Sequence, residues 1–400
     1  MIFIAIACSI VLGIGAYLGS ELLAPFQGYP ITYYGGWGAL AALLITILWL
    51  PFSYWKEGDL PQSSFKKWMI LSSYSSMGFV SFLLFFCVVR DLLSLFSRVI
   101  FFAQGLTSGP GLLGSVTSAV TGWIGGPSHL PLFVHSQIGS VLILILSLVS
   151  FSSGRKTALQ EPRVAHVPLF IHDLPEDLHG LKIVQLSDLH VGPFIRGDHV
   201  ERIVTRVNSL TPDVVVITGD LIDGSVAVIG KDVAPLQRLE SKHGTFFCTG
   251  NHEYYWEASE WLTFIQSLGI QPLENESKSI SIGASSLLIA GINDLSSDIK
   301  AASKRNSESH GFRILLAHQP KAAVEASALG FDLQLSGHTH GGQFHPWTWV
   351  ARWIHPYCQG VHRLGRMSIY VHSGTGFWGP PLRWGTHSEI ALIKLIKFRG

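Results

Sequence analysis

The chain has 400 residues, of which 48% are hydrophobic, and its formal net charge is +1. A charge so near zero excludes the basic face that a nucleic-acid binder needs to neutralise phosphates, so we expect no nucleic-acid partner. The average hides a division. Residues 1–154 hold only nine Asp, Glu, Lys or Arg, whereas the remainder holds 46 of them and 16 of the 18 histidines. The four cysteines show no CxxC pairing, which argues against a disulfide framework and against a thiolate zinc site.

The N-terminal part contains four apolar stretches long enough to span a bilayer core, which takes about 20 helical residues. They lie approximately at 3–23, 36–55, 68–89 and 130–151. Four such stretches in succession are not typical of a soluble core, so we predict a transmembrane anchor with about four helices over residues 1–154. The first stretch has no basic segment before it, which favours an uncleaved anchor over a signal peptide.

The distribution of Lys and Arg predicts the orientation of this anchor. Basic residues gather between the second and third stretches and after the fourth, at Lys56, Lys66, Lys67, Arg155, Lys156 and Arg163. The positive-inside rule then places both termini and the polar half in the cytoplasm. One miscounted span would reverse this, and "FSRVIFFAQG" reads either as an interfacial helix or as part of a longer span. No charge lies deep inside the four stretches, which favours an anchor over a transporter.

After a linker and entry segment at 155–179, short apolar strands alternate with helical stretches, which predicts an α/β domain over 180–400. The predicted strands are "LKIVQLS", "DVVVITG", "GTFFCTG", "RILLAH", "FDLQLSG", "MSIYVHSG" and "EIALIKLI". A polar residue follows each of five strands, namely Asp188, Asp220, Asn251, His318 and His338. Because strand ends of this kind open at one edge of an α/β sheet, we expect these side chains to converge.

Each of these residues belongs to a short motif that has an ordinary alternative reading. The motifs are "SDLHVG", "GDLIDG", "GNHEYY", "AHQP" and "SGHTHGGQ". Asp188 could cap a helix, the "GDLIDG" segment could be a turn, and His318 could be a hydrogen-bonded core histidine. All five motifs in this order, each after a strand, favour a metal site. In extended chain His338 and His340 would share a face, and their neighbouring glycines would leave room for a phosphate.

With these motifs the chain resembles the calcineurin-like metallophosphoesterases, whose pattern is Asp-x-His, Gly-Asp, Gly-Asn-His, a lone His and Gly-His-x-His. The resemblance covers roughly residues 180–395. It is closest to the membrane-anchored bacterial branch of transmembrane phosphodiesterase-like proteins, which is similar in "GHTHGGQ" and in the late "GPPLR" segment. It implies an N-terminal helical transmembrane bundle followed by an α/β sandwich of two sheets flanked by helices, in a bacterial inner membrane.

The resemblance also implies two divalent metal ions. One would be held by Asp188, His190, Asp220 and His340, and the other by Asp220, Asn251, His318 and His338, so that Asp220 bridges. Imidazole and carboxylate ligands suit Mn, Fe or Zn, with Mn favoured. His252 would not be a ligand, but would face the scissile phosphate and help the leaving group depart.

The implied function is cleavage of a phosphodiester or pyrophosphate bond by in-line attack of a metal-bridging hydroxide. The anchor suggests a lipid-linked substrate, so the expected partners are the bilayer and a phosphoester, with no obligate protein partner. One alternative is the UDP-2,3-diacylglucosamine pyrophosphatase of lipid A synthesis, a reaction of some membrane-anchored relatives. The other is a non-catalytic, membrane-tethered, metal-bound interaction module.

Several further residues have less specific roles in this prediction. Asp223 either supports the ligands or forms a turn, and Glu253 orients a histidine or caps a helix. Asn293 and Asp294, in "GINDL", are expected to line the cleft. The aromatic run at 344–360, "FHPWTWVARWIHPYCQG", reads either as a hairpin packed against the domain or as a membrane-facing lip that admits an acyl chain.

Overall fold

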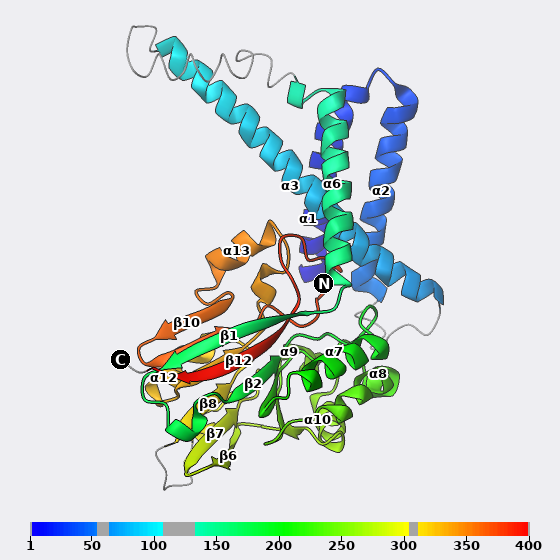
Figure 1. Cartoon of the computed structure of the whole chain (residues 1–400). Coiled ribbons are helices and arrows are strands. Elements are labelled where there is room, and N and C mark those ends of the chain that lie inside the picture. The colour runs from blue at the N-terminus through cyan, green and yellow to red at the C-terminus, as the bar shows by residue number, and fades with distance from the viewer. Residues whose placement is uncertain (1, 54–63, 107–132, 304–310, 399–400) are drawn as a thin grey trace. The chain divides into compact units, whose positions relative to one another are not determined.

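The computed structural model describes residues 2–53, 64–106, 133–303 and 311–398. The chain divides into two compact units. The first comprises Met1–Lys56 and Trp68–Ser153, and the second Glu57–Lys67 and Gly154–Gly400. Figure 1 shows long helices in the first unit, and strands with shorter helices in the second.

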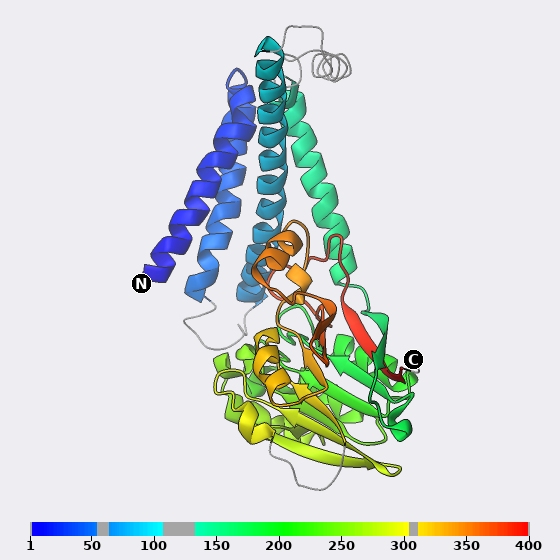
Figure 2. The ribbon, with the colours of Figure 1, turned by 90° about the vertical axis from the view of Figure 1, so that its left-hand side faces the viewer.

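The first unit is built from long apolar helices, which Figure 2 shows from a second side, and α3 runs obliquely to the others in Figure 1. They are α1 (Ile2–Leu23), α2 (Pro30–Ser53), α3 (Ser64–Leu106) and α6 (Gln137–Ala158), with a short 3-10 helix, η1 (Ala24–Phe26), after α1. Each predicted apolar stretch overlaps one of them, and residues 54–55 and 130–132 of the predicted stretches lie outside the described residues. All four are long and apolar enough to cross a membrane, at Ile4–Phe26, Pro30–Trp49, Lys67–Ile100 and Gln137–Ala158. The chain is therefore a membrane protein with four candidate spans.

Helix α3 differs from the predicted span that ends at residue 89. It continues to Leu106, so "FSRVIFFAQG" belongs to a longer helix, and Arg90 and Asp91 lie within it. Arg90 is only 4% exposed and pairs with Glu21 at 2.5 Å and with Asp91 at 2.7 Å. Paired carboxylates offset the cost of burying a cation. The spans are thus not free of charge, and that argument against a transporter does not hold for α3. Residues 107–126 of the Gly/Ser/Thr-rich run that follows lie outside the described residues.

The second unit contains two six-stranded sheets, which run in the orders β1-β12-β2-β3-β4-β5 and β10-β11-β9-β8-β7-β6. The first sheet consists of β1 (Arg163–Ile171), β2 (Lys182–Leu186), β3 (Val214–Thr218), β4 (Thr245–Cys248), β5 (Gln271–Pro272) and β12 (Glu389–Lys397). The second consists of β6 (Glu276–Ile282), β7 (Ser285–Gly291), β8 (Phe312–Leu316), β9 (Leu333–Ser336), β10 (Gly360–Leu364) and β11 (Met367–Val371). Parallel pairing joins β2, β3, β4 and β5, and likewise β7, β8, β9 and β11.

The two sheets pack face to face over one apolar core. Val214 and Val216 of β3 and Ile314 and Leu316 of β8 are fully buried members of the same cluster. Burial of each such side chain contributes about 1.5–3 kcal/mol. Strands covered on both faces read as continuous apolar runs, which is why "DVVVITG" was recognisable from sequence. The predicted fold class, apolar N-terminal helices followed by a two-sheet sandwich with helices, is confirmed.

Helices flank the sheets, and Figure 1 shows α7, α8 and α10 grouped together. The helices are α7 (Gly197–Ser209), α8 (Val226–Val233), α9 (Asn251–Tyr255), α10 (Ala258–Ser267), α11 (Ile299–Ala302), α12 (Ala323–Ala328) and α13 (Trp347–Ile354). The predicted helix "VAPLQRLES" is instead the 3-10 helix η3 (Ala234–Arg238), with Pro235 in its first turn, where its missing N–H is not needed. The aromatic run forms α13 and not a hairpin.

Strands β1, β6 and β10 were not predicted from the sequence pattern. Strand β1 lies inside the segment interpreted as linker and entry, and it pairs with β12 along its whole length. The β6–β7 hairpin and strand β10 complete the second sheet. Strands β1, β6 and β10 lie at sheet edges and their side chains are partly exposed, so their apolar pattern is weak.

A buried carboxylate links the start of β2 to the start of β3, and its removal should destabilise the second unit. Asp213 accepts from the backbone N–H of Lys182 at 2.8 Å and from Lys242 Nζ at 2.7 Å. Burial raises the pKa of Asp213. The Lys242 ammonium and the backbone N–H of Lys182 have a larger, opposite effect, so the pKa lies below its usual value. The resulting stability is present above the unfolded-state pKa and is lost as pH falls through the lower folded-state value.

We therefore expect Asp213→Asn to lower the free energy of unfolding at pH 7 by about 1–3 kcal/mol. The difference from wild type should shrink below about pH 4, because the wild-type carboxyl then takes up a proton. The measurement is thermal unfolding of the full chain in detergent at both pH values. Asp173→Asn, at an 85% exposed side chain, is the matched control. A loss that is equal at both pH values would contradict this account.

Candidate metal centre

Polar residues from both sheets meet at one edge of the sandwich. Asp188, Asp220 and Asn251 follow β2, β3 and β4 of the first sheet, and His318 and His338 follow β8 and β9 of the second. The sequence predicted convergence at one sheet edge, whereas the structure assembles the site from two sheets. A direct link holds the halves together, because the backbone N–H of His338 donates to both carboxylate oxygens of Asp188, at 3.0 and 3.2 Å.

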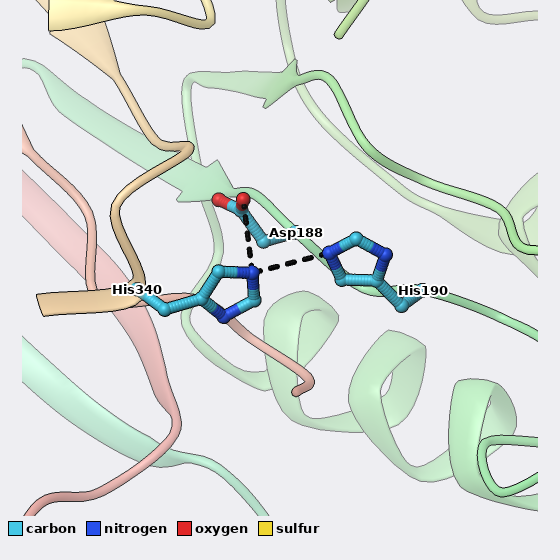
Figure 3. A group of neighbouring side chains, drawn as sticks. All are labelled: Asp188, His190 and His340. Atoms are coloured by element: carbon cyan, nitrogen blue, oxygen red, sulfur yellow. Dashed lines mark hydrogen bonds and ion pairs between the residues drawn. The ribbon is translucent and has the colours of Figure 1, made fainter. Parts of the chain in front are cut away.

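The first group of side chains is Asp188, His190 and His340, shown in Figure 3. Nε2 of His340 lies 3.4 Å from Asp188 Oδ1 and 3.1 Å from Nε2 of His190. All three residues are buried, and one donor atom from each falls within 4.8 Å of the others. A carboxylate oxygen and two ring nitrogens directed at one point form a group that could hold a metal ion.

The second group is Asp220, His318 and His338, and Asp220 also belongs to a third group with His190 and His252. Asp220 Oδ2 lies 3.1 Å from His318 Nε2 and 3.9 Å from His190 Nε2. Its carboxylate is thus within reach of both the first and the second groups. One shared carboxylate between two ligand groups is the arrangement that two neighbouring cations require.

Two acceptor atoms of the second group, His318 Nε2 and Asp220 Oδ2, face each other and require a positive charge between them. Nδ1 of His318 lies 2.7 Å from the carbonyl oxygen of Thr218, so this nitrogen carries the proton. The lone pair of Nε2 therefore faces a carboxylate oxygen of Asp220. Such a contact needs a proton or a metal ion between the two acceptors. Burial lowers the pKa of His318, but Asp220 and Asp188 outweigh it and raise the pKa to about 10. A metal ion between His318 Nε2 and the Asp220 carboxylate would take the place of that proton.

Asn251 supplies a further donor atom. It is the first residue of α9, and its Oδ1 is buried without a hydrogen-bond partner among the described residues. An unpaired buried amide oxygen costs about 1–3 kcal/mol unless something binds it. With carboxylates, imidazoles and this oxygen, the donor set fits divalent metal ions of the Mn, Fe or Zn type.

The backbone of the site is strained at five of these residues. Asp188, His190, Asp220, His338 and His340 have φ values of 53°, 49°, 49°, 71° and 50°. Non-glycine residues rarely adopt this left-handed region, and each instance costs roughly 1–3 kcal/mol. The strain persists because backbone hydrogen bonds between the strand ends fix it, as from Asp188 N to Gly219 O at 3.0 Å. Strain concentrated in this way is typical of functional sites.

The glycines of "SGHTHGGQ" make room for protein atoms, which corrects the expectation that they leave space for phosphate. A Cβ on Gly337 would lie 2.2 Å from Asp188 Oδ2, and one on Gly342 would lie 2.4 Å from the Cα of Thr348. The second expectation, that His338 and His340 share a face of extended chain, is also wrong. Both have left-handed backbone, and their side chains enter different ligand groups.

His252 lies beside the ligand groups and is oriented by Asp223. Its Nδ1 lies 2.5 Å from Asp223 Oδ1, while its Nε2 is 3.9 Å from Asp220 Oδ2. Burial lowers the pKa of His252, but Asp223 outweighs it and raises the pKa to about 9. Burial raises the pKa of Asp223, but His252 and His190 lower it to about 2. The other Asp223 oxygen is 3.3 Å from His190 Nδ1, so this carboxylate contacts two imidazoles of the site.

The remaining predicted residues lie behind or beside the groups. Glu253 is fully buried and accepts from the backbone N–H groups of Gly250, Asp220 and Leu221 at 2.6, 3.1 and 2.8 Å, which caps α9. Asp294 accepts a hydrogen bond at 2.8 Å from the side chain of Gln319, which is the residue after His318. Asn293 donates its backbone N–H to Asn275 Oδ1 at 3.1 Å. Asp294 belongs to none of the His/Cys/Asp/Glu groups found among the described residues.

Three residues near the site were missed by the sequence reasoning. Arg383, in "GPPLR", is 1% exposed and donates to the carbonyl oxygens of His340 and Gly376 at 3.2 and 2.6 Å. Tyr255 and Trp378 flank His252, with ring centroids at 5.1 and 5.9 Å. The "GPPLR" segment was noticed in the sequence, but its contact with His340 depends on the loop between β11 and β12 folding back.

Comparison with known proteins places this geometry in a family. Residues 181–342 match the calcineurin-like phosphoesterase family. The chain is 37% identical to a bovine (Bos taurus) protein named "Transmembrane protein with metallophosphoesterase domain", over 66% of this chain and 63% of the relative. It is 35% identical to the zebrafish (Danio rerio) protein of the same name, over 82% and 74%. An uncharacterised Helicobacter pylori metallophosphoesterase is 36% identical, over 66% and 74%.

The chain therefore belongs to the calcineurin-like metallophosphoesterase family. Its mostly buried His/Asp groups are consistent with the metal site of such a phosphoesterase. The match spans a little under two thirds of the bovine relative's length. The relatives come from vertebrates as well as bacteria, so the likeness extends beyond the bacterial branch that the motifs suggested.

The close approach of Gly337 to Asp188 gives a direct test of the site. Gly337→Ala should displace the Asp188 carboxylate and weaken binding of divalent metal by about 10–100-fold. Gly230→Ala is the control, because its Cβ would make only an ordinary 3.4 Å contact with Phe264. Elemental analysis of both purified full-length variants after dialysis against limiting Mn²⁺ gives the comparison. Wild-type metal content in Gly337→Ala would refute the geometry.

Proposed function

We propose that this chain is a membrane-bound hydrolase that cleaves phosphodiester or pyrophosphate bonds with two divalent metal ions. One ion would be held by Asp188, His190, Asp220 and His340, and the other by Asp220, Asn251, His318 and His338. The observation that carries the proposal is the position of Asp220, which lies within reach of both ligand groups. Oxygen donors on each ion favour Mn, although the imidazoles also suit Fe or Zn.

When bound, the ions would offset the charge of the phosphoryl oxygens and lower the pKa of a bound water. The chain's own residues then explain departure of the leaving group. His252, held at Nδ1 by Asp223, keeps its Nε2 side toward Asp220 and the shared centre. A proton on this imidazole can be donated to the leaving oxygen, which would otherwise depart as a costly alkoxide.

The surroundings of His252 favour a substituted phosphoester over a simple monoester. Tyr255 and Trp378 are 59% and 48% exposed, and their rings flank the imidazole. Aromatic faces of this kind bind the apolar part of a ligand on the leaving-group side. They support cleavage of a diester or pyrophosphate that carries a second organic group, including a lipid-linked one.

We also propose that the second unit, which carries the ligand groups and is called the catalytic unit from here on, faces the cytoplasm. The supporting observation is the position of basic residues at the ends of the helices, Lys66 and Lys67 at the start of α3 and Arg155 and Lys156 in the last turn of α6. These ends would lie on the inner side by the positive-inside rule. The apolar composition of all four helices supports membrane insertion in either orientation.

The role of His252 is tested by substitution with substrates of different leaving groups. His252→Gln should lower kcat by about 10²–10⁴-fold on an alkyl phosphodiester. The loss should be much smaller on bis(p-nitrophenyl) phosphate, because p-nitrophenolate departs without protonation. Metal content should stay at the wild-type level, whereas Asp220→Asn should lose metal and all activity.

Equal losses on both substrates would contradict a proton-donor role. A panel of aryl monoesters, aryl diesters, nucleotides and UDP-linked acyl sugars on the metal-reconstituted full chain identifies the class of bond. No turnover of any member, with metal fully bound, would favour the non-catalytic interaction module.

The orientation is tested by fusing reporters to the C-terminus. A fluorescent protein, which matures in the cytoplasm, should fluoresce, and an alkaline phosphatase, which needs an oxidising compartment, should stay inactive. The reverse pattern would place the catalytic unit outside and overturn the cytoplasmic assignment without affecting the proposed chemistry.

A further inference from the structure

Helix α13 exposes an unusually apolar surface for the catalytic unit. Of its eight residues only Thr348 is buried, and Trp353 is 87% exposed. The other exposed apolar side chains of this helix are Trp347, Trp349, Val350 and Ile354. Five large apolar side chains side by side on one short helix form a patch that water does not favour. Such patches mark surfaces that bind a partner or a membrane.

This helix is rigidly joined to the metal centre. It begins five residues after Gly342, the last residue of the 3-10 helix η5 (His340–Gly342). The backbone N–H of Thr348 donates to Phe344 O at 3.2 Å, and the Thr348 hydroxyl contacts the ring of His345. Gly342 packs so closely on Thr348 that a Cβ would overlap it. A displacement of α13 would therefore move the loop that carries His340.

Helix α13 is connected through other residues of the second unit to the last turn of α6. The last turn of α6 belongs to the catalytic unit, and Gly154 O in that turn accepts from Arg383 N at 2.9 Å. Trp384, the residue after Arg383, accepts a hydrogen bond at its carbonyl oxygen from the backbone N–H of His345 at 3.1 Å. The ring of His345 stacks on Trp349 of α13, with centroids 5.3 Å apart. Three successive contacts thus connect a candidate span to the exposed tryptophans.

The bilayer is the occupant that these contacts favour. Helix α6 is a candidate span that ends at Ala158, with Arg155 and Lys156 in its last turn. Basic side chains at a span end lie among lipid headgroups, at the depth where tryptophan rings also partition. Arg352 adds a cation to α13 itself, which suits an anionic lipid surface.

We propose that α13 inserts its tryptophans into the membrane interface beside the end of α6. The metal centre then acts on phosphoesters that the bilayer holds by an apolar chain. The buried Gln343 connects the segment before α13 to a residue that flanks His252, because its side chain donates to Trp378 O at 3.0 Å and accepts from Trp378 N at 2.8 Å. The insertion of α13 stands on its own, whereas the substrate class rests on the function proposed above.

Insertion is tested without any substrate, in the full chain reconstituted into phosphatidylcholine and phosphatidylglycerol nanodiscs. A spin label at Trp353→Cys is compared with one at Ser209→Cys, an exposed position on α7. The background carries Cys8→Ser, because the other three cysteines are buried. We expect the label at 353 to be accessible to oxygen and protected from a water-soluble nickel complex, and the label at 209 to show the opposite.

Nickel accessibility at 353 equal to that at 209 would overturn the insertion. Protection from both reagents, or dipolar broadening between labels, would assign the patch to a second copy or another protein and would equally overturn it.

The substrate class is tested with two phosphodiesters that share one leaving group. These are bis(p-nitrophenyl) phosphate in solution and hexadecyl p-nitrophenyl phosphate in phosphatidylcholine vesicles. The double variant Trp347→Ser/Trp353→Ser should lower the ratio of vesicle to solution activity by about ten-fold. Trp349 is left in place because it stacks on His345. The control Val324→Ser/Val361→Ser removes two other exposed apolar side chains and should leave the ratio unchanged.

A ratio equal to that of wild type would overturn the lipid-held substrate class. Wild-type protein that hydrolyses neither diester would instead sink the proposed function, while the nanodisc measurement would still decide whether α13 is inserted.

Discussion

Buried donor groups that converge from two sheets impose the main constraint on this molecule. The Asp188 carboxylate accepts the backbone N–H of His338, and Asp220 faces the lone pair of His318 at 3.1 Å. Without a bound cation, the lone pair of His318 Nε2 and the Asp220 carboxylate can meet at this distance only if a proton lies between them. In the proposed metal site, binding of the ions would be coupled to closure of the sandwich, because Asp188, His318 and His338 also make contacts between the two sheets.

The chain tolerates considerable local cost to achieve this arrangement. Five left-handed residues and an unpaired Asn251 oxygen each oppose folding by an amount comparable to one good hydrogen bond. The apolar core between the sheets offsets that cost, since strands such as β3 are buried on both faces. Strain at the strand ends is thus supported by a rigid sandwich, which is also what fixes the ligand positions.

The catalytic unit and the membrane are related through chain continuity. The second unit begins within the last turn of α6, and the loop that carries His340 continues directly into α13. The second unit thus contains the ligand groups, the aromatic helix and the end of a candidate span. Under the proposed insertion of α13, the anchor would take part in substrate selection, because a phosphoester held in the bilayer is concentrated near the site.

The sequence by itself determined the class of the fold and the residue types of the site. Buried strands such as "DVVVITG" read as uninterrupted apolar runs, and each ligand motif follows such a strand, so local pattern was sufficient. Only the tertiary structure decided that two sheets share the site and that α3 continues past Arg90, since these depend on pairing between distant segments. The same holds for Gly337, whose neighbour is Asp188, and for Arg383, whose partner is His340. A sequence motif specifies which side chains are present, whereas contacts made across 40 to 150 residues arise only when the chain packs.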